Sequence, residues 1–77
     1  MKEKKNNRKD SILISQINLN IKLIREQLGM SQSELDRLTG LRSYKYESGK
    51  QEMTLTTIGI FSLALKIKPY QLFIRGA

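Results

Sequence analysis

The sequence contains no cysteine and no histidine among its 77 residues. These absences exclude a thiol nucleophile, an imidazole general base, a Cys/His zinc site and any His-dependent catalytic triad. The seven Asp and Glu residues are scattered among fourteen Lys and Arg, which leaves no candidate catalytic constellation. We therefore expect no enzymatic activity and no cofactor. The lack of cysteine also fits a reducing compartment, and we expect a cytoplasmic protein.

Long apolar runs are missing as well. The basic start is followed only by the short stretch from Ile12 to Ile14, far below the ~18 residues of a membrane span, and it does not form a signal peptide. The hydrophobic share of 39% and the charged share of 27% are those of one small globular domain. A core of this size supplies only about 3–5 kcal/mol, and no disulfide adds to it. Oligomerisation is therefore expected.

The net charge of +7 favours a polyanionic partner, because neutralising phosphates releases condensed counterions. Nucleic acid is the first candidate and an anionic membrane surface the second. Alternatively, the excess of Lys and Arg only keeps the chain soluble. Residues 1–10 carry five Lys and Arg against Glu3 and Asp10, which predicts a basic flexible tail, with the folded domain at 11–77.

Helical periodicity dominates the rest of the chain. Four apolar residues recur at spacings of four, three and four from residue 17 to residue 28, which predicts a helix from Ser11 to Leu28 that Gly29 ends. Ser31 and Glu34 form a capping box, so a second helix starts at Ser31, with Leu35 and Leu38 facing inward.

A short, polar and basic third segment covers 42–47, and Thr54 caps a fourth helix. Pro69 suits the first position of a fifth helix. Period-two alternation is hardly seen, so we predict an all-α, compact bundle of about five short helices. The apolar contacts of the fourth helix are expected from Leu55, Ile58, Phe61, Leu63, Leu65 and Ile67.

The second and third helices, joined by a tight turn at Gly40, have the pattern of a helix-turn-helix. Four motifs extend this pattern: Leu28-Gly29-Met30-Ser31-Gln32, Leu38-Thr39-Gly40-Leu41, Tyr46-Glu47-Ser48-Gly49-Lys50 and Tyr70-Gln71-Leu72-Phe73. With these motifs the sequence resembles, over roughly residues 17–73, the phage repressor and Cro-like (XRE-type) helix-turn-helix family. The resemblance implies a lambda-repressor-like domain that binds double-stranded DNA as a homodimer, with no small-molecule ligand and no membrane partner.

The same resemblance implies roles for individual residues. Gln32 matches a family residue that contacts phosphate and braces the recognition helix, and Lys50 matches one that meets backbone phosphate. Arg25 and Glu47 match the two partners of a structural salt bridge. Gln32 would otherwise be an ordinary exposed residue at a helix start.

The sequence departs from the family between Gly40 and Glu47, where six residues stand in place of the usual nine. This shortened recognition helix has lost nearly one turn, or roughly 300° of rotation, so Tyr46 and Glu47 are still expected to face inward. Arg42 is the candidate for a guanine edge, Ser43 and Tyr44 for phosphate or base contacts, and Lys45 for phosphate. The alternative is that this is a solvated polar face.

We therefore predict a sequence-specific DNA-binding transcriptional regulator, repressor-like, acting as a homodimer on a palindromic operator. One alternative is a protein-interaction or dimerisation module, for example antitoxin-like, that retains the fold with weakened base readout. Another is non-specific binding through charge alone. Leftover apolar residues favour the homodimer, since Leu19 and Leu23 lie off the main stripe of the first helix and Phe73 and Ile74 follow the last predicted helix start. The resemblance implies that the C-terminal helices form the interface.

Overall fold

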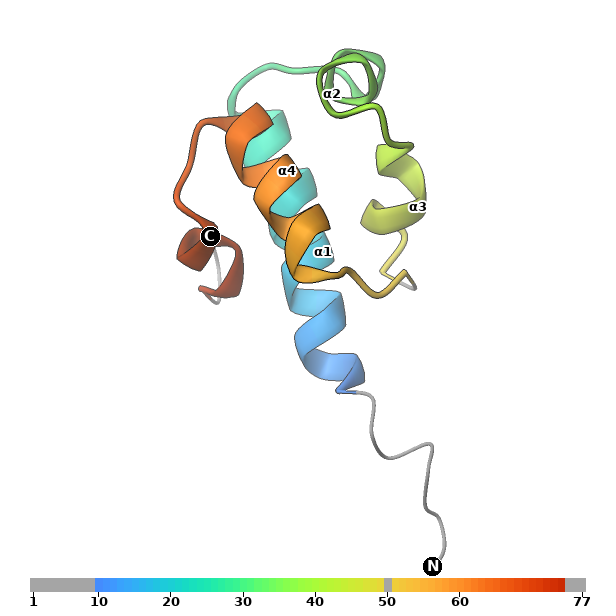
Figure 1. Cartoon of the computed structure of the whole chain (residues 1–77), viewed down its shortest axis with the longest axis vertical. Helices are drawn as coiled ribbons and strands as arrows, with labels where there is room; N and C mark the ends of the chain where they lie inside the picture. The colour runs from blue at the N-terminus through green and yellow to red at the C-terminus, as the bar shows by residue number, and fades with distance from the viewer. Residues whose placement is uncertain (1–9, 50, 75–77) are drawn as a thin grey trace, which may run out of the picture.

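A computed structural model describes residues 10–49 and 51–74 of the chain, and this part is all-helical. Figure 1 shows α4 lying in front of α1, α2 across one end of the pair, and α3 and the last helix on opposite sides. The predicted order of helices is confirmed, except that the fifth is a 3₁₀-helix. The elements are α1 (Ser11–Gln27), α2 (Gln32–Thr39), α3 (Ser43–Glu47), α4 (Leu55–Leu65) and the 3₁₀-helix η2 (Pro69–Phe73).

Helix α1 begins with a cap that the sequence analysis assigned to the tail. The Asp10 carboxylate accepts a 2.9 Å hydrogen bond from the Leu13 N–H, which satisfies one free donor of the first turn. Three residues of the predicted stripe, Ile17, Ile21 and Ile24, are buried as expected, whereas the fourth, Leu28, follows the last residue of α1 and is 54% exposed. Residues 1–9, which make up the rest of the predicted tail, lie outside the described residues.

The capping box at the start of α2 is present in both directions. The Glu34 N–H donates to Ser31 Oγ at 3.1 Å, and the Ser31 N–H donates to Glu34 Oε1 at 3.3 Å. Leu35 is fully buried, whereas Leu38 is 56% exposed, so the prediction that both face inward is wrong for Leu38. A helix of only eight residues buries a narrow stripe, and Leu38 lies at its edge.

Helix α4 contributes the largest buried side chain of the core, Phe61. Thr54 caps it as predicted, accepting from the Thr57 N–H at 3.1 Å. Leu55 and Leu63 are 84% and 81% exposed, so the prediction that they make core contacts is wrong. Leu63 lies across the helix from the inward stripe of Ile58, Phe61 and Leu65, whereas Leu55 is the first residue of α4, one turn before Ile58.

The C-terminal helix η2 is held against α1 by a buried amide. Asn20 Nδ2 donates to the carbonyl oxygens of Leu72 at 2.8 Å and Ile74 at 2.6 Å, and the Leu72 side chain is fully buried. Helix η2 covers one side of the α1/α4 pair, and α3 lies on the other side (Figure 1). The outer face of α3 is therefore not covered by η2.

Candidate nucleic-acid interface

The turn between α2 and α3 is fixed by side chains as well as by Gly40. Gly40 takes the left-handed conformation at φ 75°, and Thr39 Oγ1 both donates to the Leu35 carbonyl at 2.8 Å and accepts from the Leu41 N–H at 3.0 Å. These contacts stop α2 and redirect the chain over the three residues 40–42, as the helix-turn-helix requires.

Asp36 caps α3 from the preceding helix. Its Oδ1 accepts a 2.7 Å hydrogen bond from the Ser43 N–H, while Arg42 at the N-cap position makes no side-chain cap of its own. This role of Asp36 was not predicted from the sequence. The sequence shows no capping residue before this short helix, and its free N–H groups therefore need a hydrogen-bond acceptor from another part of the chain.

Arg25 of α1 and Glu47 of α3 form a buried ion pair. Arg25 Nε lies 2.7 Å from Glu47 Oε2 and Arg25 Nη2 lies 3.1 Å from Oε1, and the two side chains are only 10% and 4% exposed. The hydrogen bond to Glu47 raises the pKa of Arg25 above its ordinary value, against the opposing effect of burial. The guanidinium also donates from Nη1 to the Met30 carbonyl at 2.8 Å, so it also holds the turn that leads from α1 into α2.

Gln32 joins the same carboxylate from the start of α2. Its Nε2 donates to Glu47 Oε1 at 2.9 Å, and the side chain remains exposed. Glu47 therefore connects three helices: α1 through Arg25, α2 through Gln32, and its own α3. This is the bracing role that the resemblance implied for Gln32.

The loss of nearly one turn from α3 is absorbed without exposing its inner face. Tyr46 packs edge-on against Phe61, with ring centroids 5.2 Å apart and an interplanar angle of 71°. Ser43 is fully buried, so its side chain presents no surface for the phosphate or base contact that was predicted. It lies one turn before Tyr46 and Glu47, and in a helix of five residues that position belongs to the inner face.

Three predicted DNA-contacting residues share the outer surface of α3. Arg42, Tyr44 and Lys45 are exposed, and Tyr44 keeps 53% of its surface accessible. Tyr44 and Lys45 line a shallow hollow together with Ser48 and Gln51. Lys50, the predicted phosphate contact, lies outside the described residues.

The charge of this surface is positive. Among the described residues, the ion pairs join Arg25 to Glu47 and, at 3.9 Å, to Glu26, so neither Arg42 nor Lys45 is paired with a described carboxylate. In the same part of the chain, no three Asp or Glu side chains gather closely enough to hold a metal ion. No helix of residues 10–49 and 51–74 is long and apolar enough to cross a membrane.

Comparison with known proteins gives the same fold. A hypothetical transcription factor from Neisseria, NHTF, is similar with a TM-score of 0.76 and 32% identity, over 88% of this chain and 83% of that chain. The restriction-modification controller protein C.AhdI from Aeromonas hydrophila is similar with a TM-score of 0.72 and 33% identity, over 78% and 96% of the two chains. No sequence among curated proteins matches.

A helix-turn-helix family model matches residues 21–72, which includes α2, the turn, α3 and the Arg25–Glu47 pair. The match covers more than half of the chain, and it agrees with the capping box, the turn glycine and the three-helix connection at Glu47. The chain therefore belongs to the helix-turn-helix family, in its phage repressor and Cro-like (XRE-type) branch.

Proposed function

We propose that this DNA-binding regulator recognises a specific palindromic operator as a homodimer, and that it represses transcription without catalytic activity. The observation that carries the proposal is the outer face of α3, where Arg42, Tyr44 and Lys45 are exposed on a helix braced by Glu47. A braced helix presents its side chains in one register, which base readout requires. We also place its action in the cytoplasm, where DNA is accessible.

Each exposed residue has a chemistry suited to a duplex. The planar guanidinium of Arg42 suits a bidentate contact with the O6 and N7 atoms of guanine, and Lys45 suits a phosphate. The half-exposed ring of Tyr44 suits a thymine methyl group or a phosphate oxygen. Gln32 is exposed at the N-terminus of α2, whose free N–H groups favour a phosphate.

The small core of this domain and the two-fold symmetry of the proposed operator support the homodimer. A 77-residue chain without disulfides has a small core, and two copies related by a two-fold axis would place two α3 helices about 34–36 Å apart on DNA. Repression needs only occupancy of the operator, whereas activation needs an additional contact with the transcription machinery. The names of the two similar structures, a transcription factor and a controller protein, are consistent with a regulatory role.

The decisive experiment is selection of bound duplexes from a random DNA pool at about 0.15 M salt. We expect a palindromic consensus with half-sites one helical turn apart. Recovery of unrelated sequences, together with a steep salt dependence, would show binding through charge alone.

Substitution of Arg42 tests direct base readout. Arg42→Ala should cost about 1–3 kcal/mol on the selected site and relax the preference at one base position, since Arg42 caps nothing in the fold. Lys45→Ala should weaken all sequences alike and lower the salt slope by about one. Lys68→Ala is the matched control, because it removes the same charge at the N-cap of η2, on the opposite side of the molecule. It should leave the DNA affinity and the salt slope unchanged. Titration against specific and scrambled duplexes at two salt concentrations measures all three.

The shortness of α3 favours a second candidate function. With Ser43 buried and only five helical residues, α3 offers a smaller reading surface than the family's usual helix. A module that retains the fold for protein interaction, in the manner of an antitoxin, fits this reduction. An unchanged specificity ratio in both Arg42→Ala and Tyr44→Ala would favour this candidate over base readout.

A further inference from the structure

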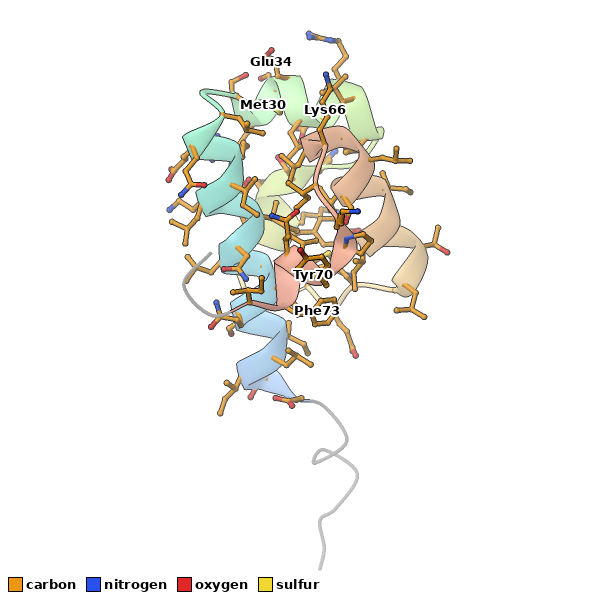
Figure 2. All side chains as sticks on the ribbon, turned by 90° about the vertical axis from the view of Figure 1, so that its left-hand side faces the viewer. Met30, Glu34, Lys66, Tyr70 and Phe73 are labelled. Atoms are coloured by element: carbon orange, nitrogen blue, oxygen red, sulfur yellow. The ribbon has the colours of Figure 1, made fainter. Side chains whose placement is uncertain are left out.

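A hollow of about 250 Å³ lies beside the N-terminal half of α1. Four parts of the fold bound it: that half of α1, the segment 52–53, the first turn of α4 and the end of η2. Figure 2 shows Phe73, which lines the hollow from η2, at the level of the N-terminal half of α1. Seven of the ten lining residues are apolar, among them Ile14 and Met53. A concave apolar surface with a few polar groups is the usual form of a small-ligand site.

The three polar residues of the hollow are Asp10, Asn18 and Glu52, and their free side-chain atoms are all acceptors. Asn18 is fully buried, and its Nδ2 donates to the Gln51 carbonyl at 3.1 Å. This hydrogen bond fixes the orientation of the amide and leaves Asn18 Oδ1 without a partner among the described residues. A buried acceptor without a donor costs free energy, so a donor in the hollow would remove that cost.

The charge of the hollow is negative, although the whole chain carries +7. Glu52 makes no ion pair and no side-chain hydrogen bond with a described residue, and Asp10 uses one carboxylate oxygen to cap α1. No described Lys or Arg lines the hollow. The starts of α1 and α4 each contribute about half a positive charge at its edge, which two full negative charges exceed. The hollow therefore favours a cation.

We propose that this hollow binds a small organic ammonium ion that carries one apolar ring. The ring would lie against Ile14, Met53 and Phe73, and the ammonium group would donate to the two carboxylates, with Asn18 Oδ1 as a further acceptor. At about 30 Å³ for each heavy atom, 250 Å³ holds about eight or nine heavy atoms, which is a ring with a short ammonium arm. The resemblance to repressors implies no small-molecule ligand, and this site departs from that expectation.

The size and the chemistry of the hollow exclude other occupants. Ten lining residues are far fewer than the roughly 20–30 on each side of a typical protein–protein interface. An anionic ligand would meet two like charges. A purely apolar ligand would exclude water from Glu52 and Asn18 Oδ1 without replacing its hydrogen bonds, which is costly.

Asn18 also joins the hollow to the proposed DNA-binding surface. Its amide holds the carbonyl of Gln51, and the Gln51 side chain lines the shallow hollow at α3 with Tyr44 and Lys45. A ligand that bonds Oδ1 holds the amide in the orientation that keeps Gln51 in place, and its charge offsets two carboxylates on a protein that meets phosphates. Both effects should raise DNA affinity. This link rests on the proposed function, whereas the ligand site does not.

Titration of the full chain with phenethylammonium, followed by heteronuclear NMR, tests the site. The probe should shift the side-chain amide signals of Asn18. Those of Asn20 should stay unchanged, because its Oδ1 already accepts from Gln16 Nε2 at 3.1 Å and its Nδ2 donates to two carbonyls. Phenethyl alcohol, which has the same ring without the charge, should bind at least tenfold more weakly. Equal affinities, or no shift of Asn18 at roughly 10 mM probe, would overturn the proposal.

Glu52→Gln tests the charge of the site while keeping the shape of the side chain. The dissociation constant of phenethylammonium should rise at least fivefold, and that of phenethyl alcohol should stay unchanged. Glu26→Gln is the matched control, because Glu26 is also exposed and lies on α1 outside the hollow. Both positions are at the surface, so the thermal midpoints should persist. An equal loss of probe affinity in the two variants, or none in Glu52→Gln, would contradict the assignment.

DNA affinity separates the ligand site from the operator proposal. On a duplex selected by the parent chain, saturating phenethylammonium should tighten binding at least twofold relative to the same concentration of ammonium chloride, and Glu52→Gln should lose this response. If the probe binds but DNA affinity does not change, the link through Asn18 is wrong and the ligand site stands. If no sequence is selected while the probe binds, the operator proposal is wrong and the ligand site stands. If a palindrome is selected but Asn18 never shifts, the ligand site is wrong and the operator proposal stands.

Discussion

At the scale of single residues, the position of α3 depends on one carboxylate. Glu47 accepts from Arg25 and from Gln32, and it is almost completely buried. A buried carboxylate is stable only with such partners, because its desolvation is costly. The side chain that fixes α3 is therefore also the one whose loss should disturb the DNA-binding surface most.

A double-mutant cycle of Arg25→Met and Glu47→Gln measures this dependence. Each single change leaves the other partner buried without its counterpart and should lower the free energy of unfolding by about 3–5 kcal/mol. The double variant should lose less than the sum, by about 1–3 kcal/mol. Urea unfolding gives these values, and purely additive losses would contradict the observed pair.

Substitution of Ser43, unlike that of Arg25 or Glu47, is not expected to destabilise the fold. Its Oγ is buried without a hydrogen-bond partner among the described residues, so removing it relieves a desolvation cost. Ser43→Ala should keep or raise the free energy of unfolding, by up to about 1 kcal/mol, and leave DNA affinity unchanged. Ser62→Ala is the matched control, because Ser62 Oγ is buried but donates to the Ile58 carbonyl at 2.8 Å. A loss of DNA affinity in Ser43→Ala would restore the predicted contact.

The site was predictable from sequence where a residue's role is carried by type and spacing. Arg25, Glu47 and Gln32 were identified because the motif fixes their positions on the surrounding helices. Ser43 was misplaced because the missing turn changes which residue faces inward, and only packing against neighbouring helices decides that. Asn20 was not identified as an anchor, since its acceptors are backbone carbonyls more than fifty residues away.

At the scale of elements, most helix ends are set by a local signal, whereas the start of α3 is capped by Asp36 of the preceding helix. Asp10, Ser31 and Thr54 cap the starts of α1, α2 and α4, and Gly40 ends α2. Helix α4 instead ends at Lys66, which takes the left-handed conformation at φ 59° (Figure 2). Among the described residues, Lys66 is the one non-glycine residue with positive φ. This conformation costs a residue with a Cβ atom about 1–2 kcal/mol.

Lys66→Gly should therefore stabilise the fold. Glycine adopts the left-handed region freely, so relief of strain should outweigh the added entropy of the unfolded chain and raise the free energy of unfolding by about 0.5–1 kcal/mol. Lys68→Gly, at a position with negative φ, removes the same charge and should destabilise instead. Thermal unfolding of both variants decides, and destabilisation by Lys66→Gly would mean that its side chain makes a compensating contact.

The number and order of the helices could be predicted from apolar periodicity and capping residues, whereas the exposure of individual apolar side chains could not. Leu38, Leu55 and Leu63 were expected inside because they are apolar, and all three are exposed. A helix on the outside of a small domain has one inner stripe only, so apolar residues beyond that stripe remain outside.

At the scale of the whole molecule, the proposed reading surface and much of the positive charge lie in different parts of the chain. Arg42, Tyr44 and Lys45 are exposed at α3, whereas five of the fourteen Lys and Arg precede α1 in residues 1–9. Phosphate contacts raise affinity for every sequence, and base contacts separate one sequence from another. A short reading helix combined with a basic N-terminal segment therefore predicts an affinity that depends strongly on salt.

Deletion of residues 2–9 tests this division of roles. The deletion removes Lys2, Lys4, Lys5, Arg8 and Lys9 together with Glu3, and it retains Asp10, so the cap of α1 and the thermal midpoint should persist. Each lost phosphate contact should lower the slope of log affinity against log salt by about 0.9. Affinity should fall equally for specific and scrambled duplexes, which leaves the specificity ratio unchanged. Asp10→Ala is the control, because it should cost about 1 kcal/mol of stability without lowering the slope. An unchanged slope after deletion would mean that the segment does not meet DNA, and a reduced specificity ratio would mean that it reads bases as well.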